Sequence, residues 1–111
     1  MAAKRVHVAL TVPNLGEAVR DYSTRLGVNP TVVVAGEYAL FLTPVLNLSL
    51  TAAPGKPGSL RHLGLEDPGC LQKSAESDPG GVLWERFSLE QQAEEVRQRW
   101  PQTKWNPKSG S

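Results

Sequence analysis

The order of the strand and helix patterns in the first half of the chain limits the fold more than any other feature. In "RVHVALTV", residues 5–12, side chains alternate with a period of two, which predicts a strand. In "NLGEAVRDYSTRLG", residues 14–27, Asn14 stands at an N-cap position and Gly27 at the position of a left-handed C-terminal residue, which predicts a helix. The runs "PTVVVA", "EYALFLTPV" and "LNLSLTAA" then predict three more strands. This order of elements indicates an α+β fold.

A second histidine-bearing strand pattern follows a linker rich in Pro and Gly. The segment "APGKPGS" cannot continue a central strand and separates two halves of the chain. After it, "SLRHLGLE" places His62 at a strand position comparable to that of His7. We therefore expect one domain, residues 1–111, with a weak internal repeat. Its expected parts are a first module at 4–53, a linker at 54–58, a divergent second module at 59–105 and a disordered tail at 106–111.

The second half matches the first half only in its opening strand. "DPGCLQKSAESDPGG" is polar and rich in turn residues, "VLWERF" is a short strand candidate, and Ser88 with Gln91 predicts a capped helix over residues 89–100. Two interpretations stay open. In one, Leu71 to Ala75 form a rudimentary helix and "VLWERF" is the last strand of a shortened module. In the other, residues 89–100 are the helix of the second module and the chain ends before its last strands.

Composition is typical of a globular domain and argues against several kinds of partner. The chain has 111 residues, of which 40% are hydrophobic and 21% are charged, as in ordinary globular proteins. A net charge of +1 provides no electrostatic footprint for nucleic acid or an anionic membrane. Cys70 is the one cysteine, and "MAAKRVHVAL" lacks the apolar region of a signal peptide. We expect a cytoplasmic protein that binds neither nucleic acid nor membranes.

The segments "VHVALTVPNLGEAVRDYSTRLGVNP" and "LRHLGLE" resemble the vicinal oxygen chelate superfamily, which includes glyoxalase I, extradiol dioxygenases and the bleomycin and fosfomycin resistance proteins. Within it, the chain is most similar to the cadmium-induced protein and organoarsenical carbon–arsenic lyase branch. "SDPGGVLWERF" is similar to the terminal strand pattern of the family, a turn that leads to an aromatic residue and Glu. The resemblance implies a βαβββ module of this type, followed by an incomplete or divergent second module.

The resemblance also implies a metal site on three residues. Family members hold a metal on side chains from the first strand of each module and on a glutamate of the terminal strand, and these positions fall on His7, His62 and Glu85. Two imidazoles and one carboxylate on one face of a divalent ion leave positions open for substrate and oxygen. This donor set suits Fe2+ first, and also Mn2+ or Zn2+. Without the resemblance, a strand histidine is more often a hydrogen-bonded structural residue, and a glutamate is more often a solvated surface group.

Two departures from the family pattern narrow the expected chemistry. Four-ligand members carry a further glutamate on the strand that matches "LNLSLTAA", where this chain offers Asn47, Ser49 and Thr51. That argues against glyoxalase I chemistry. The carbon–arsenic lyase branch holds arsenic on a vicinal cysteine pair, whereas Cys70 stands alone. Thiol capture of arsenic or cadmium is therefore not expected.

Two classes of function are consistent with the sequence. The first is a glyoxalase- or dioxygenase-like, metal-dependent enzyme, an Fe2+-type oxygenase or lyase that acts on a small molecule. The alternative is a protein of the bleomycin-resistance kind, which binds a small ligand without chemistry. In either case the expected pocket residues are Tyr38, Phe41, Trp84 and Phe87.

The incomplete second half also predicts an assembly. A complete module beside a shortened one leaves strand edges and an apolar sheet face open, and such surfaces are normally covered by a partner chain. We therefore expect a homodimer.

Overall fold

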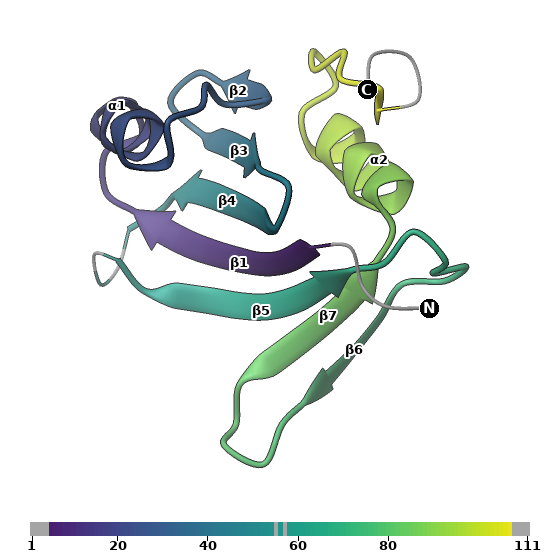
Figure 1. Ribbon diagram of the computed structural model, residues 1–111. Coiled ribbons are helices and arrows are strands. Elements are labelled where there is room, and N and C mark those ends of the chain that lie inside the picture. Colours follow the sequence, from purple (N-terminus) through teal and green to yellow (C-terminus); the bar gives the residue numbers. More distant parts are fainter. Residues whose placement is uncertain (1–4, 55, 57, 108–111) are drawn as a thin grey trace.

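The computed structural model describes residues 5–54, 56 and 58–107, and it shows an α+β fold in which one seven-stranded sheet carries two helices (Figure 1). Most of the expected tail, residues 108–111, lies outside the described residues, as do residue 4 and two residues of the linker. Neither helix of the described ranges is long and apolar enough to cross a membrane. In chain order the elements are β1 (Arg5–Val12), α1 (Leu15–Leu26), β2 (Val32–Val34), β3 (Tyr38–Leu42), β4 (Leu46–Ala52), β5 (Leu60–Glu66), β6 (Ser74–Ser77), β7 (Leu83–Phe87) and α2 (Leu89–Arg99).

The sheet consists of two halves that meet at its centre. Its strand order is β2-β3-β4-β1-β5-β7-β6, and β1 and β5 pair antiparallel at the junction. In the first half the opening strand β1 lies parallel to the closing strand β4, and in the second half β5 lies parallel to β7 in the same way. The remaining neighbours are antiparallel. The weak repeat in the sequence thus corresponds to a repeated strand arrangement.

Helix α1 begins and ends where the sequence predicts. The Asn14 side chain accepts a hydrogen bond from the backbone N–H of Glu17 at 3.0 Å, and Gly27 follows the helix in the left-handed conformation with φ of 70°. Both devices satisfy backbone groups that the ends of a helix leave without partners. The helix packs on one face of the first half, against a buried core that contains Phe41, Leu48 and Leu50.

The second half is shorter than the first because it lacks a helix between its first and last strands. Leu71 to Ala75, which one interpretation assigned to a rudimentary helix, are not helical, and β6 begins at Ser74 inside this stretch. The Asp78 carboxylate then accepts hydrogen bonds from the backbone N–H groups of Gly80 and Val82, which closes the β6–β7 turn. Among the described residues, β6 is therefore the one element between β5 and β7. The helix predicted over residues 89–100 is α2, which follows β7 and therefore does not lie between β5 and β7.

Helix α2 covers the opposite face of the first half from α1 (Figure 1). It begins with the predicted capping box, in which the Ser88 side chain and the Gln91 side chain bond each other's backbone N–H groups. Its buried stripe continues to Trp100, which packs in a second core with β2 and β3. Along β3, Ala39 and Phe41 face the α1 core, whereas Tyr38 and Leu40 face the α2 core. Period-2 alternation thus divides one strand between two cores.

Trp84 lies on the face of β7 opposite to Glu85. Its indole Nε1 donates to the carboxylate of Asp78 at 3.0 Å, and the side chain is only partly buried. The helix that would cover this face in a complete second half is missing from the described residues. The indole therefore packs over the hairpin turn instead.

We expect Trp100→Ala to destabilise the protein far more than Trp84→Ala. The Trp100 ring is 6% exposed, stacks on Tyr38 with centroids 4.7 Å apart, and donates to Glu37 Oε1 at 2.9 Å. Truncating a buried tryptophan costs about 3–5 kcal/mol. Urea unfolding of both variants measures the difference, and equal losses would contradict this assignment of the second core.

Candidate metal centre

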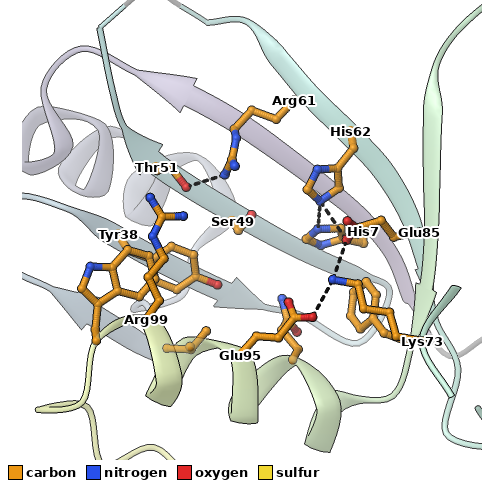
Figure 2. Close-up of a pocket in the computed structure, with 14 residues that line it drawn as sticks. His7, Tyr38, Ser49, Thr51, Arg61, His62, Lys73, Glu85, Glu95 and Arg99 are labelled. Atoms are coloured by element: carbon orange, nitrogen blue, oxygen red, sulfur yellow. Dashed lines mark hydrogen bonds and ion pairs between the residues drawn. The ribbon is translucent and has the colours of Figure 1, made fainter. Parts of the chain in front are cut away.

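His7, His62 and Glu85 come together on three adjacent strands, β1, β5 and β7 (Figure 2). The Nε2 atoms of the two histidines are 3.1 Å apart, and His62 Nε2 lies 3.2 Å from Glu85 Oε1. One donor atom from each residue fits within 4.8 Å of the other two. The sequence nominated these three residues, and the structure places their donor atoms within reach of one ion.

Gly64 allows the two outer strands to send their side chains over the strand between them. His7, Gly64 and Glu85 form one row across β1, β5 and β7. A Cβ at Gly64 would approach the backbone oxygen of Glu85 to 2.8 Å and His7 Cδ2 to 3.2 Å. The glycine therefore leaves the space that the His7 imidazole and the backbone carbonyl of Glu85 need.

Asn47 determines which nitrogen of His7 faces the cluster. His7 is 3% exposed, and its Nδ1 lies 2.8 Å from Asn47 Oδ1 and 3.1 Å from the Asn47 backbone oxygen. Both neighbours are acceptors, so Nδ1 carries the proton and donates it. The lone pair of Nε2 then points toward His62 and Glu85, which is the tautomer that binds a metal through Nε2. Asn47 on β4 therefore fixes the orientation of the His7 imidazole.

The Asn47 amide is held in turn by two elements outside its own strand. Its Nδ2 donates to Glu66 Oε1 at 2.9 Å and to Gln92 Oε1 at 2.7 Å. Glu66 is 2% exposed, and Arg5 Nη1 bonds both of its carboxylate oxygens at 2.8 and 2.9 Å. Gln92 Nε2 also donates to Asn47 Oδ1 at 3.2 Å, and since the Glu66 carboxylate, already bonded by Arg5, accepts from Nδ2, the Asn47 amide can take only one orientation. Asn47 is therefore a rigid support for His7.

The cluster combines a neutral imidazole and an ionised carboxylate, and the ammonium group of Lys73 lies beside this carboxylate. Burial lowers the pKa of His7, so its imidazole is neutral near pH 7. The hydrogen bond from His62 lowers the pKa of Glu85, so its carboxylate is ionised. Lys73 Nζ lies 3.5 Å from Glu85 Oε1 and 2.6 Å from Glu95 Oε2. A neutral imidazole and an ionised carboxylate are the forms in which His7 and Glu85 bind metal, whereas His62 Nε2 would give up the proton that it donates to Glu85 when an ion binds.

A cavity of about 190 Å³ opens beside the cluster, and two of the four expected pocket residues line it. Tyr38 and Phe87 are in its wall, and the Phe87 ring meets His7 edge-on with centroids 5.0 Å apart. Phe41 and Trp84, the other two expected pocket residues, do not line the cavity. Phe41 is fully buried in the α1 core beside Tyr22, and Trp84 lies on the other face of β7. Aromatic character nominated these two, whereas the face of the sheet on which each lies excludes them.

Arg61, Lys73, Arg99 and Trp100 also line the cavity, and the sequence analysis assigned none of them to a site. Arg61 reaches it through a bulge: Ala9 pairs with His62 and Leu10 with Leu60, so Arg61 is the extra residue of β5. It donates to Thr51 Oγ1 at 2.9 Å. A regular strand would have sent Arg61 to the face opposite His62. No local sequence signal marks this bulge, although the helical stripe that ends at Trp100 does place that residue on the packed face of α2.

Comparisons with known proteins inform the fold and leave the family open. No family model matches the chain, and no curated protein matches it. Among solved structures, the chain is similar to the NAD-dependent benzaldehyde dehydrogenase from Legionella pneumophila, with a TM-score of 0.52 and 16% sequence identity. The match covers 76% of this chain and 98% of that chain. At this identity the likeness concerns the fold alone.

We expect Asn47→Leu to weaken metal binding and to destabilise the protein. Leucine has a similar volume but removes Oδ1, so that His7 Nδ1 keeps only the backbone oxygen, and it leaves the amide of buried Gln92 without the Asn47 amide, at about 1–3 kcal/mol for each buried group that loses its partner. Loss of a residue that orients a ligand typically lowers metal affinity about 10- to 100-fold. Calorimetric titration and urea unfolding measure the two effects. Ser49→Ala, two residues along the same face of β4, serves as the control, and equal behaviour of both variants would contradict the orienting role.

We expect the metal-free protein to lose stability as the pH falls below 6.5, the ordinary pKa of histidine. The lowered pKa of folded His7 means that the unfolded chain takes up a proton there first, so the contribution of His7 is complete above pH 6.5 and is lost as the pH falls through this window. His7→Asn keeps an N–H for Asn47 but does not titrate, and His62 and Glu85 are unchanged in it. The urea midpoint should therefore change more between about pH 7.5 and about pH 5.5 in the wild type than in His7→Asn. An equal change of the midpoint in both proteins would refute the assignment of this pH dependence to His7.

Proposed function

We propose that this chain is a divalent-metal protein of the vicinal oxygen chelate type, in which His7, His62 and Glu85 hold Fe2+, with Mn2+ or Zn2+ as alternatives. Its proposed activity is that of an oxygenase or lyase acting on a small molecule in the adjacent cavity. The observation that carries the proposal is the set of three donor atoms within 4.8 Å of one another, supplied by three neighbouring strands.

The strand arrangement supports the proposed family. Each half has a histidine on its opening strand, and each opening strand lies parallel to the closing strand of its own half. The first half has the βαβββ order that the resemblance implies, and the second half retains β5, β6 and β7. We interpret the second half as a module that has lost its helix and one strand, with Glu85 on its closing strand.

The donor set and its surroundings support metal binding more than a purely structural role. Two imidazoles and one carboxylate form a facial set, and the side of the cluster toward the cavity is free of further protein ligands among the residues lining it. When bound, such an ion orders substrate and oxygen and stabilises developing negative charge.

Side chains of the cavity have separate tasks in this proposal. Phe87 covers one side of the His7 ring and keeps water away from it. Without an ion, the ammonium group of Lys73 offsets the negative charges of Glu85 and Glu95. A bound ion would take over this role at Glu85. Burial raises the pKa of Tyr38, so its hydroxyl stays protonated and can donate a hydrogen bond to a ligand.

Ligand binding without chemistry is the second candidate. The stack of Tyr38 on Trp100 gives the cavity an aromatic wall that does not depend on a metal. A protein that only sequesters a ligand would bind it equally well after treatment with a chelator. Turnover that requires the ion separates the enzyme from this alternative.

We expect Glu85→Gln to abolish tight metal binding, while Glu95→Gln leaves it nearly unchanged. Both carboxylates contact Lys73, but only Glu85 reaches the histidines. Losing a ligand should cost more than the roughly 10- to 100-fold effect of losing an orienting residue. Titration of metal-free protein with Fe2+ under anaerobic conditions, and with Mn2+ and Zn2+, measures the affinity. Equal affinities for the two variants, or no binding to the wild type, would refute the proposal.

A further inference from the structure

The cavity has a second charged end, separate from the metal cluster. Arg61 enters from β5 and Arg99 from the last turn of α2, and both line the cavity. Figure 2 shows their guanidinium groups approaching Thr51 from opposite sides, away from His7 and Glu85. The charges of both arginines, and that of Glu95, also act on the hydroxyl of Tyr38, which belongs to the aromatic wall.

Neither guanidinium has a carboxylate partner within salt-bridge distance among the described residues. Arg61 spends one N–H on the Thr51 hydroxyl, which is neutral. Arg99 lies over the Trp100 ring at 4.6 Å from its centroid, a contact that leaves its N–H donors free. Glu95, one turn before Arg99 on the same helix, is bonded to Lys73 instead. The two arginines therefore present positive charge and planar sets of donors, of which one N–H of Arg61 is bonded within the described residues.

The walls between the two ends suit a planar apolar group. Tyr38 and Trp100 are stacked at 4.7 Å, and Phe87 and Val96 complete an apolar lining. The cavity volume of about 190 Å³ exceeds the roughly 150 Å³ that accommodates benzene in an apolar cavity. One aromatic ring with a short acidic substituent therefore fits.

We infer that this cavity binds a small aromatic carboxylate, with its carboxylate held by Arg61 and Arg99 and its ring against Tyr38 and Trp100. Arginine forks match the two oxygens of a carboxylate, which favours this anion over a neutral ligand. The inference names the ligand class of the proposed metal enzyme and rests on that function for any chemistry. Binding itself requires only the arginines and the aromatic wall, and it can be tested without metal.

The test is a calorimetric or NMR titration of metal-free protein with benzoate, benzamide and acetate. Benzoate should bind, benzamide should bind at least tenfold more weakly because it lacks the charge, and acetate should bind at least tenfold more weakly because it lacks the ring. Equal affinities for benzoate and benzamide would overturn the role of the arginines. Equal affinities for benzoate and acetate would overturn the role of the aromatic wall.

Arg61→Gln and Arg99→Gln should each raise the dissociation constant of benzoate at least tenfold. Arg61→Lys, which keeps the charge but loses the planar fork, should lie between Arg61→Gln and the wild type. Arg25→Gln, on exposed α1 and outside the cavity, is the control and should bind like the wild type. Unchanged affinity in both cavity variants would refute the inference, with circular dichroism showing that the variants fold.

A parallel titration with Zn2+ on the same samples separates this inference from the proposed function. Metal binding without benzoate binding would refute the ligand class and leave the metal proposal in place. Benzoate binding without metal binding would support the anion site and refute the metal enzyme.

Discussion

The side-chain amide of Asn47 connects four elements of the fold. From β4 it bonds His7 on β1, Glu66 on β5 and Gln92 on α2, and all four side chains are buried. Buried polar groups are stable only when each has its partner, so this network permits one register of the strands and one position of the helix. Among buried side-chain atoms of the described residues, only Thr103 Oγ1 has no partner, and it lies outside the network. The position of His7 in the cluster depends on this arrangement.

The shortened second half explains both the geometry of the cluster and the position of α2. With only β6 between them in the chain, β5 and β7 still pair in parallel, and Gly64 leaves room for His7 and Glu85 on either side. Without α2, the face of the first half of the sheet that carries Tyr38 and Leu40 would be exposed to water. The stripe of α2 that ends at Trp100 closes it and at the same time forms one wall of the cavity. One helix thus completes a core and shapes a binding site.

One end of the cavity carries two carboxylates and a lysine beside the histidines, and the other end carries two arginines. This separation of charge supports the proposed ligand. At one end, the carboxylates of Glu85 and Glu95 meet Lys73 beside the two histidines. At the other end, Arg61 and Arg99 have no acid partner among the described residues, as argued above. A ligand that spans the aromatic wall places its anionic group at the arginines and its remaining part toward the cluster. Low dielectric in such a cavity strengthens both interactions.

The sequence by itself determined what depends on neighbouring residues. Period-2 alternation and helix caps predicted most elements, including α2 from the pair Ser88 and Gln91, because these signals act over a few residues. Alternation also placed His7, His62 and Glu85 on defined faces of their strands. Only the tertiary structure decided which face of each strand packs against which helix. For this reason Phe41 and Trp84 were assigned to a pocket that they do not line. The bulge at Arg61, the strand at Ser74 and the contact of Asn47 with Gln92 arise from pairing between distant segments, and no local pattern records such pairing.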